Sequence, residues 1–172
     1  MYRASADTLV VGITIVVVIV LVAVAVGGIV GAVMVRAPRM VQITLLFPAV
    51  TCVGIIAVAY AYTPRAFRLG DDALVVARLA GDVTVPLRDI RTVQSVPSPL
   101  AGSVRVAGNG GLFGFWGRYR SEALNGNFTF YGTRATGGVA LTTSDGTVVI
   151  TPDDPDRFVI DIERRLGHAA AG

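Results

Sequence analysis

Hydrophobic residues are distributed very unevenly along this chain. Two runs, residues 8–35 and 41–62, are dominated by Val, Ile, Ala and Leu and contain no charged residue. A helix needs about 20 apolar residues to cross the roughly 30 Å hydrocarbon core of a bilayer, and each run is long enough. Only a short segment around Pro38 separates the two runs. Residues 1–63 are therefore predicted to form a hairpin of two transmembrane helices, at about 8–35 and 41–62.

Small residues recur at a fixed spacing in the first of these runs. Ala23, Gly27 and Gly31 are each four positions apart, which places them on one face of a helix. Such a face permits close approach of a second helix. We expect these three residues to pack against the second helix of the same hairpin, with homodimerisation as the alternative.

After residue 63 the pattern changes to short apolar stretches separated by turn residues. Phe128 and Phe130 alternate with more polar positions, as in a strand with one buried face, and Asp145-Gly146 is a strong signal for a tight hairpin turn. The expected strands cover residues 67–69, 73–79, 83–86, 92–96, 128–131, 139–143 and 147–151.

One amphipathic helix is expected to follow the strands. Phe158, Ile162 and Leu166 recur every four residues, and Gly167 is placed to end the helix. Aspartates just before it suit a helix N-terminus, which explains them better than a metal site does: Asp153, Asp154 and Asp156. The predicted fold class is mainly β with α, a small barrel or bent β-sandwich over residues 64–167 closed by this helix. Residues 168–172 are expected to form a flexible tail.

Three segments of this region carry a family resemblance. They are residues 85–93, the Gly/aromatic stretch 108–120, and residues 150–158, which contain Pro-Asp-Asp-Pro followed by Phe158. In this order they resemble bacterial pleckstrin-homology-like (PH-like) domains over about residues 64–167. The resemblance implies a PH-like barrel with a C-terminal helix, commonly attached to membrane helices, and no catalytic residues. The phosphoinositide pocket of eukaryotic relatives is not implied, because no matching basic loop is present.

Composition excludes several classes of function. From Thr63 onward 12 arginines face 11 acidic residues, whereas a nucleic-acid-binding module shows a dense basic face. Cys52 is the only cysteine and lies in the second apolar run, so no internal disulfide and no cysteine metal site can form. His168 is the only histidine and lies near the C-terminus, which argues against a Ser-His-Asp hydrolase. We expect no enzyme activity, no cofactor and no metal.

The Gly/aromatic stretch 108–120 is the most unusual local sequence, and it allows two interpretations. In the first, it is a surface loop that meets lipid headgroups or a protein partner through these candidate interaction residues: Phe113, Phe115, Trp116, Arg118 and Arg120. In the second, its glycines permit tight backbone packing while its aromatic residues fill the barrel.

Arginines near the ends of the predicted helices suggest an orientation. Arg3, Arg65 and Arg68 flank the outer ends, against Arg36 and Arg39 in the connecting loop. Positively charged residues near helix ends favour the cytoplasmic side. The domain is therefore predicted to lie in the cytoplasm, with Arg65 and Arg68 as candidate membrane-surface residues.

These features lead to a hypothesis about function. The chain is expected to be a multi-pass plasma-membrane protein whose PH-like domain holds a protein partner or anionic lipid headgroups at the inner membrane face, without catalysis. The alternative is an accessory subunit of a membrane transporter or sensor complex, in which the helical hairpin does the recognition. Homo-oligomerisation is compatible with both.

Overall fold

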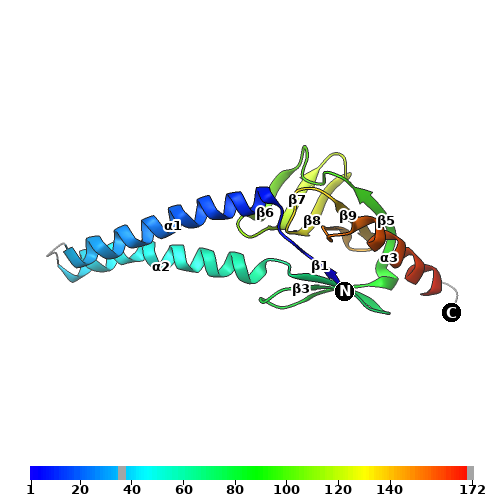
Figure 1. Cartoon of the computed structure of the whole chain (residues 1–172), viewed down its shortest axis with the longest axis horizontal. Coiled ribbons are helices and arrows are strands. Elements are labelled where there is room, and N and C mark those ends of the chain that lie inside the picture. The colour runs from blue at the N-terminus through cyan, green and yellow to red at the C-terminus, as the bar shows by residue number, and fades with distance from the viewer. Residues whose placement is uncertain (35–37, 170–172) are drawn as a thin grey trace.

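Two long helices stand side by side and project away from a β-rich domain (Figure 1). The computed structural model describes residues 1–34 and 38–169. Helix α1 (Thr8–Met34) and helix α2 (Arg39–Tyr62) are both long and apolar enough to cross a membrane, and most of their surface is not covered by the rest of the chain. Arg36 and Ala37 of the predicted connecting loop lie outside the described residues.

Glycines on α1 allow α2 to approach closely. A Cβ atom added to Gly28 would lie 2.5 Å from the carbonyl oxygen of Leu45, and one added to Gly31 would lie 3.8 Å from the Leu45 side chain. Ala23 and Gly27 are exposed on another side of α1, and nothing lies within 4 Å of a Cβ atom added to Gly27. Of the three predicted packing residues, only Gly31 therefore faces α2, and Gly28 takes the position of closest approach.

The domain is a sandwich of two β-sheets and a C-terminal helix. One sheet has four strands in the order β1-β2-β3-β4, and the other has six in the order β5-β9-β10-β8-β7-β6. All pairings within them are antiparallel except that of β8 with β10. The strands are β1 (Tyr2–Arg3), β2 (Ala66–Leu69), β3 (Ala73–Ala77), β4 (Val83–Pro86), β5 (Ile90–Val96), β6 (Val104–Gly110), β7 (Phe115–Ser121), β8 (Gly126–Gly132), β9 (Gly138–Thr143) and β10 (Gly146–Ile150).

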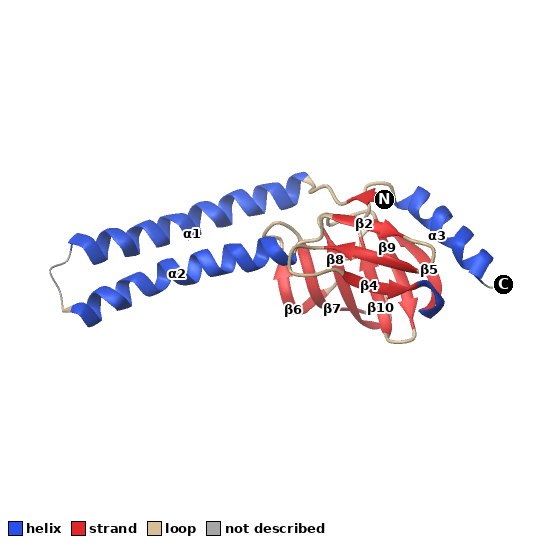
Figure 2. Cartoon of the chain, turned by 90° about the horizontal axis from the view of Figure 1, so that it is seen from below, coloured by secondary structure: helices blue, strands red, loops and turns tan. Residues whose placement is uncertain are grey.

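The main hydrophobic core includes residues from both sheets and is closed by helix α3 (Pro155–Ala169), at the end of the domain farthest from α1 and α2 (Figures 1 and 2). Phe158 and Ile162 on α3 are fully buried in this core, which confirms the predicted fold class of a bent sandwich closed by a helix. Burial of such side chains contributes roughly 1.5–3 kcal/mol each.

The C-terminal end of α3 differs from the prediction. The expectation that Gly167 ends the helix is wrong, because α3 continues through it to Ala169. A glycine inside a helix costs only about 1 kcal/mol relative to alanine, and the packing of Phe158 and Ile162 outweighs this. Residues 170–172 of the expected flexible tail lie outside the described residues.

The N-terminal segment that precedes α1 packs on the domain, which the sequence did not indicate. Strand β1 pairs with β2, with Tyr2 opposite Phe67, and the Tyr2 ring lies 5.0 Å from the ring of Phe158. The Tyr2 hydroxyl donates a hydrogen bond to Asp161 on α3. Burial and this hydrogen bond raise the pKa of Tyr2 to about 12. The domain therefore includes residues that precede α1 in the sequence as well as residues that follow α2.

Candidate membrane-surface site

The Gly/aromatic stretch forms a β-hairpin rather than a loop. Strands β6 and β7 pair through Gly108 and Gly117, and both glycines have positive φ, at 113° and 124°. A Cβ atom on Gly108 would lie 2.2 Å from the Trp116 carbonyl oxygen, and one on Gly117 would lie 2.2 Å from that of Ala107. Only glycine fits this approach of the two backbones.

The turn of this hairpin, residues 111–114, contacts α1. The Thr14 hydroxyl accepts a hydrogen bond from the Phe113 N–H at 2.8 Å and donates one to the Gly111 carbonyl at 3.3 Å. Phe113 has a φ of 61°, a left-handed conformation that is uncommon for an aromatic residue. The Asn109 side-chain amide supports the turn by donating to the carbonyls of Leu112 and Gly114, at 2.6 and 2.7 Å. The turn is therefore held in one conformation by polar contacts.

The start of α1 is fixed to the domain as well. The Asp7 carboxylate accepts hydrogen bonds from two backbone N–H groups, those of Val10 at 2.8 Å and Ala135 at 2.9 Å. The first bond caps α1, and the second ties this cap to the segment between β8 and β9. One turn later Val10 is only 1% exposed and packs with Phe115 and Tyr119 in a second hydrophobic cluster.

The end of α2 is surrounded by aromatic and arginine side chains. Tyr60 contacts Phe113 edge to face, with the ring centroids 5.3 Å apart, and the Arg65 guanidinium lies 4.7 Å from the Tyr60 centroid. Tyr62 stacks on Trp116 at 5.0 Å, and the Arg78 guanidinium lies 5.4 Å from the Tyr62 centroid. Each tyrosine therefore contacts both an arginine and an aromatic residue of the β6–β7 hairpin. We name this set the aromatic collar: Tyr60, Tyr62, Arg65, Arg78, Phe113 and Trp116.

The predicted interaction residues of the hairpin fall into separate environments. Phe113 and Trp116 belong to the aromatic collar, whereas Phe115 is 7% exposed and packs against Phe130 in the second cluster. Arg118 and Arg120 are exposed on β7. Phe115 is therefore a packing residue, whereas Arg118 and Arg120 lie on the surface of the domain.

The two predicted membrane-surface arginines also differ. Arg65 belongs to the aromatic collar, while Arg68 is exposed on β2 and makes no collar contact. Arg78, which follows β3, was not singled out in the sequence. An arginine directly after a strand carries no local signal that its guanidinium will lie over the ring of Tyr62.

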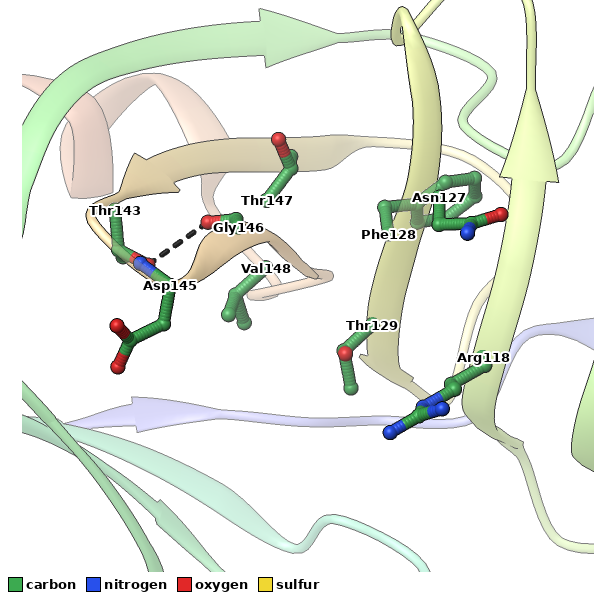
Figure 3. Close-up of a pocket in the computed structure, with 9 residues that line it drawn as sticks. All are labelled: Arg118, Asn127, Phe128, Thr129, Thr143, Asp145, Gly146, Thr147 and Val148. Carbon is green, nitrogen blue, oxygen red and sulfur yellow. Dashed lines mark hydrogen bonds between the residues drawn. The ribbon is translucent and has the colours of Figure 1, made fainter.

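A pocket of about 340 Å³ is lined by residues of β7, β8 and β10 and of the turn between β9 and β10 (Figure 3). Arg118 and Asp145 lie at opposite sides of it, and Thr129 and Val148 lie between them. The Arg118 side chain makes no hydrogen bond or ion pair within residues 1–34 and 38–169, although its backbone is paired within the sheet. Its guanidinium is therefore available to a ligand.

Comparison with known proteins identifies the domain. The family model described as "Bacterial PH domain" matches residues 65–166. A search of curated proteins and a search of solved structures each gave no significant match.

Proposed function

Because the chain belongs to the bacterial PH domain family, whose domains are generally non-catalytic interaction modules, we propose that it is a membrane-anchored module that holds a protein or lipid partner at the inner membrane face. One observation supports this most strongly: the domain is fixed to both helices of the hairpin. Asp7, Val10 and Thr14 hold α1, and the aromatic collar holds the end of α2. Attachment at two helices restricts rotation of the domain relative to the hairpin.

Helix length supports a position of the aromatic collar at the membrane surface. The 27 residues of α1 and 24 residues of α2 extend about 40 and 36 Å, against a hydrocarbon core of about 30 Å. We place the extra helix length at the end of the hairpin next to the domain, because Val10 and Thr14 of α1 already contact the domain there. The aromatic collar then lies at headgroup level, where tyrosine and tryptophan are enriched in membrane proteins.

The proposed function needs a partner that can be captured on the exposed face of β7. In native membranes, we would replace Arg120 of the full chain with a photoreactive phenylalanine analogue and identify the adducts. The same analogue in place of Ile160, which is 57% exposed on α3, is the control. We expect protein or lipid adducts from position 120 that position 160 does not give. Equal adducts from the two positions would contradict the proposal.

The inner-face orientation has its own test. We expect Ala37→Cys, in a Cys52→Ala background, to react with an impermeant thiol reagent in intact cells, while Ser144→Cys in the same background does not. Labelling of position 144 and protection of position 37 would reverse the orientation.

A second candidate function is recognition by the helical hairpin itself. It is favoured by Ala23 and Gly27, which lie on a side of α1 that α2 does not cover. Another membrane helix could approach α1 closely there. Under this alternative, Gly27→Leu abolishes association with the partner complex, whereas under the first proposal it leaves the adducts from position 120 unchanged.

A further inference from the structure

An apolar groove runs along α2 next to the aromatic collar. It encloses about 480 Å³ and is lined on α2 by Gly54, Ile55 and Val58, and on the hairpin by Gly108 and Trp116. Residues 54, 55 and 58 share one face of the helix. Since nothing lies within 4 Å of a Cβ atom added to Gly54, this glycine leaves the groove open rather than serving a helix contact.

The groove lies at a depth that lipid chains occupy, if the aromatic collar marks the bilayer surface as proposed above. Val58 lies four residues before Tyr62, which is about 6 Å along the helix, and Gly54 lies eight residues before Tyr62, which is about 12 Å. The groove lining is almost entirely apolar, and a groove of this kind at this depth is filled by an acyl chain in a bilayer.

Positive charge lies directly beyond the outer end of the groove. Trp116 forms part of the groove wall and stacks on Tyr62, whose other neighbour is the guanidinium of Arg78. Arg118 follows Trp116 by two residues on β7, so both side chains project from the same face of the sheet. The apolar surface therefore passes into a cationic one at the level of the aromatic collar.

From this continuity we propose that the groove and the two arginines form a binding site for one anionic phospholipid of the bilayer. An acyl chain lies along Gly54 and Val58, and Arg78 and Arg118 bind the headgroup phosphate. The order of apolar groove, aromatic ring and guanidinium matches the order of chain, glycerol and phosphate in a phospholipid. This inference rests on the proposed function, because it names the lipid that the module holds.

Trp116 is the only tryptophan of the chain and lines the groove, so its fluorescence reports on the proposed site. The full chain is reconstituted in phosphatidylcholine vesicles that contain phosphatidylglycerol, with bromine on the acyl chains of one lipid at a time. We expect brominated phosphatidylglycerol to quench Trp116 more strongly than brominated phosphatidylcholine at the same mole fraction. Loss of one arginine near an anionic headgroup should reduce this preference about fivefold. The preference should also fall as salt concentration rises.

Paired variants separate the two parts of the site. Arg78→Gln with Arg118→Gln should abolish the preference for phosphatidylglycerol. Arg88→Gln, in the turn just before β5, with Arg91→Gln on β5 removes the same charge near the opposite edge of the six-stranded sheet and should leave the preference unchanged. Gly54→Leu should fill the groove and weaken quenching by both lipids, whereas Gly27→Leu, at an equally open position on α1, should not. Arg118→Gln alone serves as a second variant, because Arg118 has no partner among the described residues whose loss would disturb folding.

Two results would overturn the inference: equal quenching by the two lipids in the unmodified chain, or a preference that survives loss of Arg78 and Arg118. If either occurs while position 120 still gives a specific protein adduct, the lipid site is wrong and the proposed function stands with a protein partner. If position 120 also gives no specific adduct, both fail together.

Discussion

The two hydrophobic clusters of this domain differ in how their parts are brought together. The first cluster lies between the sheets and is closed by Phe158 and Ile162 of α3. In the helix and strands that form it, the spacing of apolar residues along the sequence already shows which face is buried. The second cluster and the aromatic collar join the β6–β7 hairpin to the start of α1 and the end of α2, about 50–100 residues earlier in the chain. The first cluster stabilises the fold, whereas the second fixes the position of the fold relative to the helices. Changes in the two regions should therefore affect different properties.

The largest effect on stability is expected in the first cluster. Phe158→Ala should lower the free energy of unfolding by about 3–5 kcal/mol, because it leaves a cavity where the fully buried Phe158 ring of α3 packs in the core between the two sheets. Chemical denaturation of the full chain in detergent micelles measures this. Ile160→Ala on the exposed side of the same helix should have little effect, and equal losses from the two variants would show that α3 does not close the core.

A smaller effect is expected from the hairpin that bears the aromatic collar. Gly117→Ala should cost about 2–3 kcal/mol and shift the emission of Trp116, because the new methyl group would collide with the Ala107 carbonyl. Gly126→Ala is a matched control, since Gly126 has a similar φ of 130° but nothing within 4 Å of its Cβ position. If both variants lose the same stability, backbone strain rather than the close approach of β6 and β7 decides the result.

The smallest of the three effects is expected at the cap of α1. Asp7→Ala removes one carboxylate that holds two N–H groups and should cost about 1 kcal/mol. Its distinctive consequence is local: the Ala135 amide should exchange with solvent faster, while amides of α3 remain protected. Unchanged protection at Ala135 would show that this carboxylate does not tie α1 to the domain.

Much of the fold could be predicted from the sequence, because each of those elements carries its own signal. The lengths of the apolar runs predict α1 and α2, the spacing of Phe158 and Ile162 predicts α3, and the alternation around Phe128 and Phe130 predicts β8. Strand β1 could not be predicted, since two residues have no periodicity and their pairing depends on β2, more than 60 residues away.

The candidate site was predictable only in part. The unusual composition of residues 108–120 drew attention to Trp116, but which aromatic rings face the core depends on the side of the β6–β7 hairpin that α1 and α2 cover. Phe115 and Trp116 are neighbours in the sequence and lie on opposite faces of β7. The contribution of Arg78 and of the N-terminal segment depends on contacts between distant parts of the chain, and no local pattern encodes them.

The depth of Trp116 in the bilayer tests most directly whether the second cluster holds the domain against the membrane. Vesicles of uncharged lipid, brominated at different positions along the acyl chain, report this depth through quenching of the single tryptophan. We expect quenching to be strongest for bromines nearest the headgroup and to decline toward the bilayer centre. Absence of quenching by every lipid in the series would place the aromatic collar away from the membrane and contradict the account.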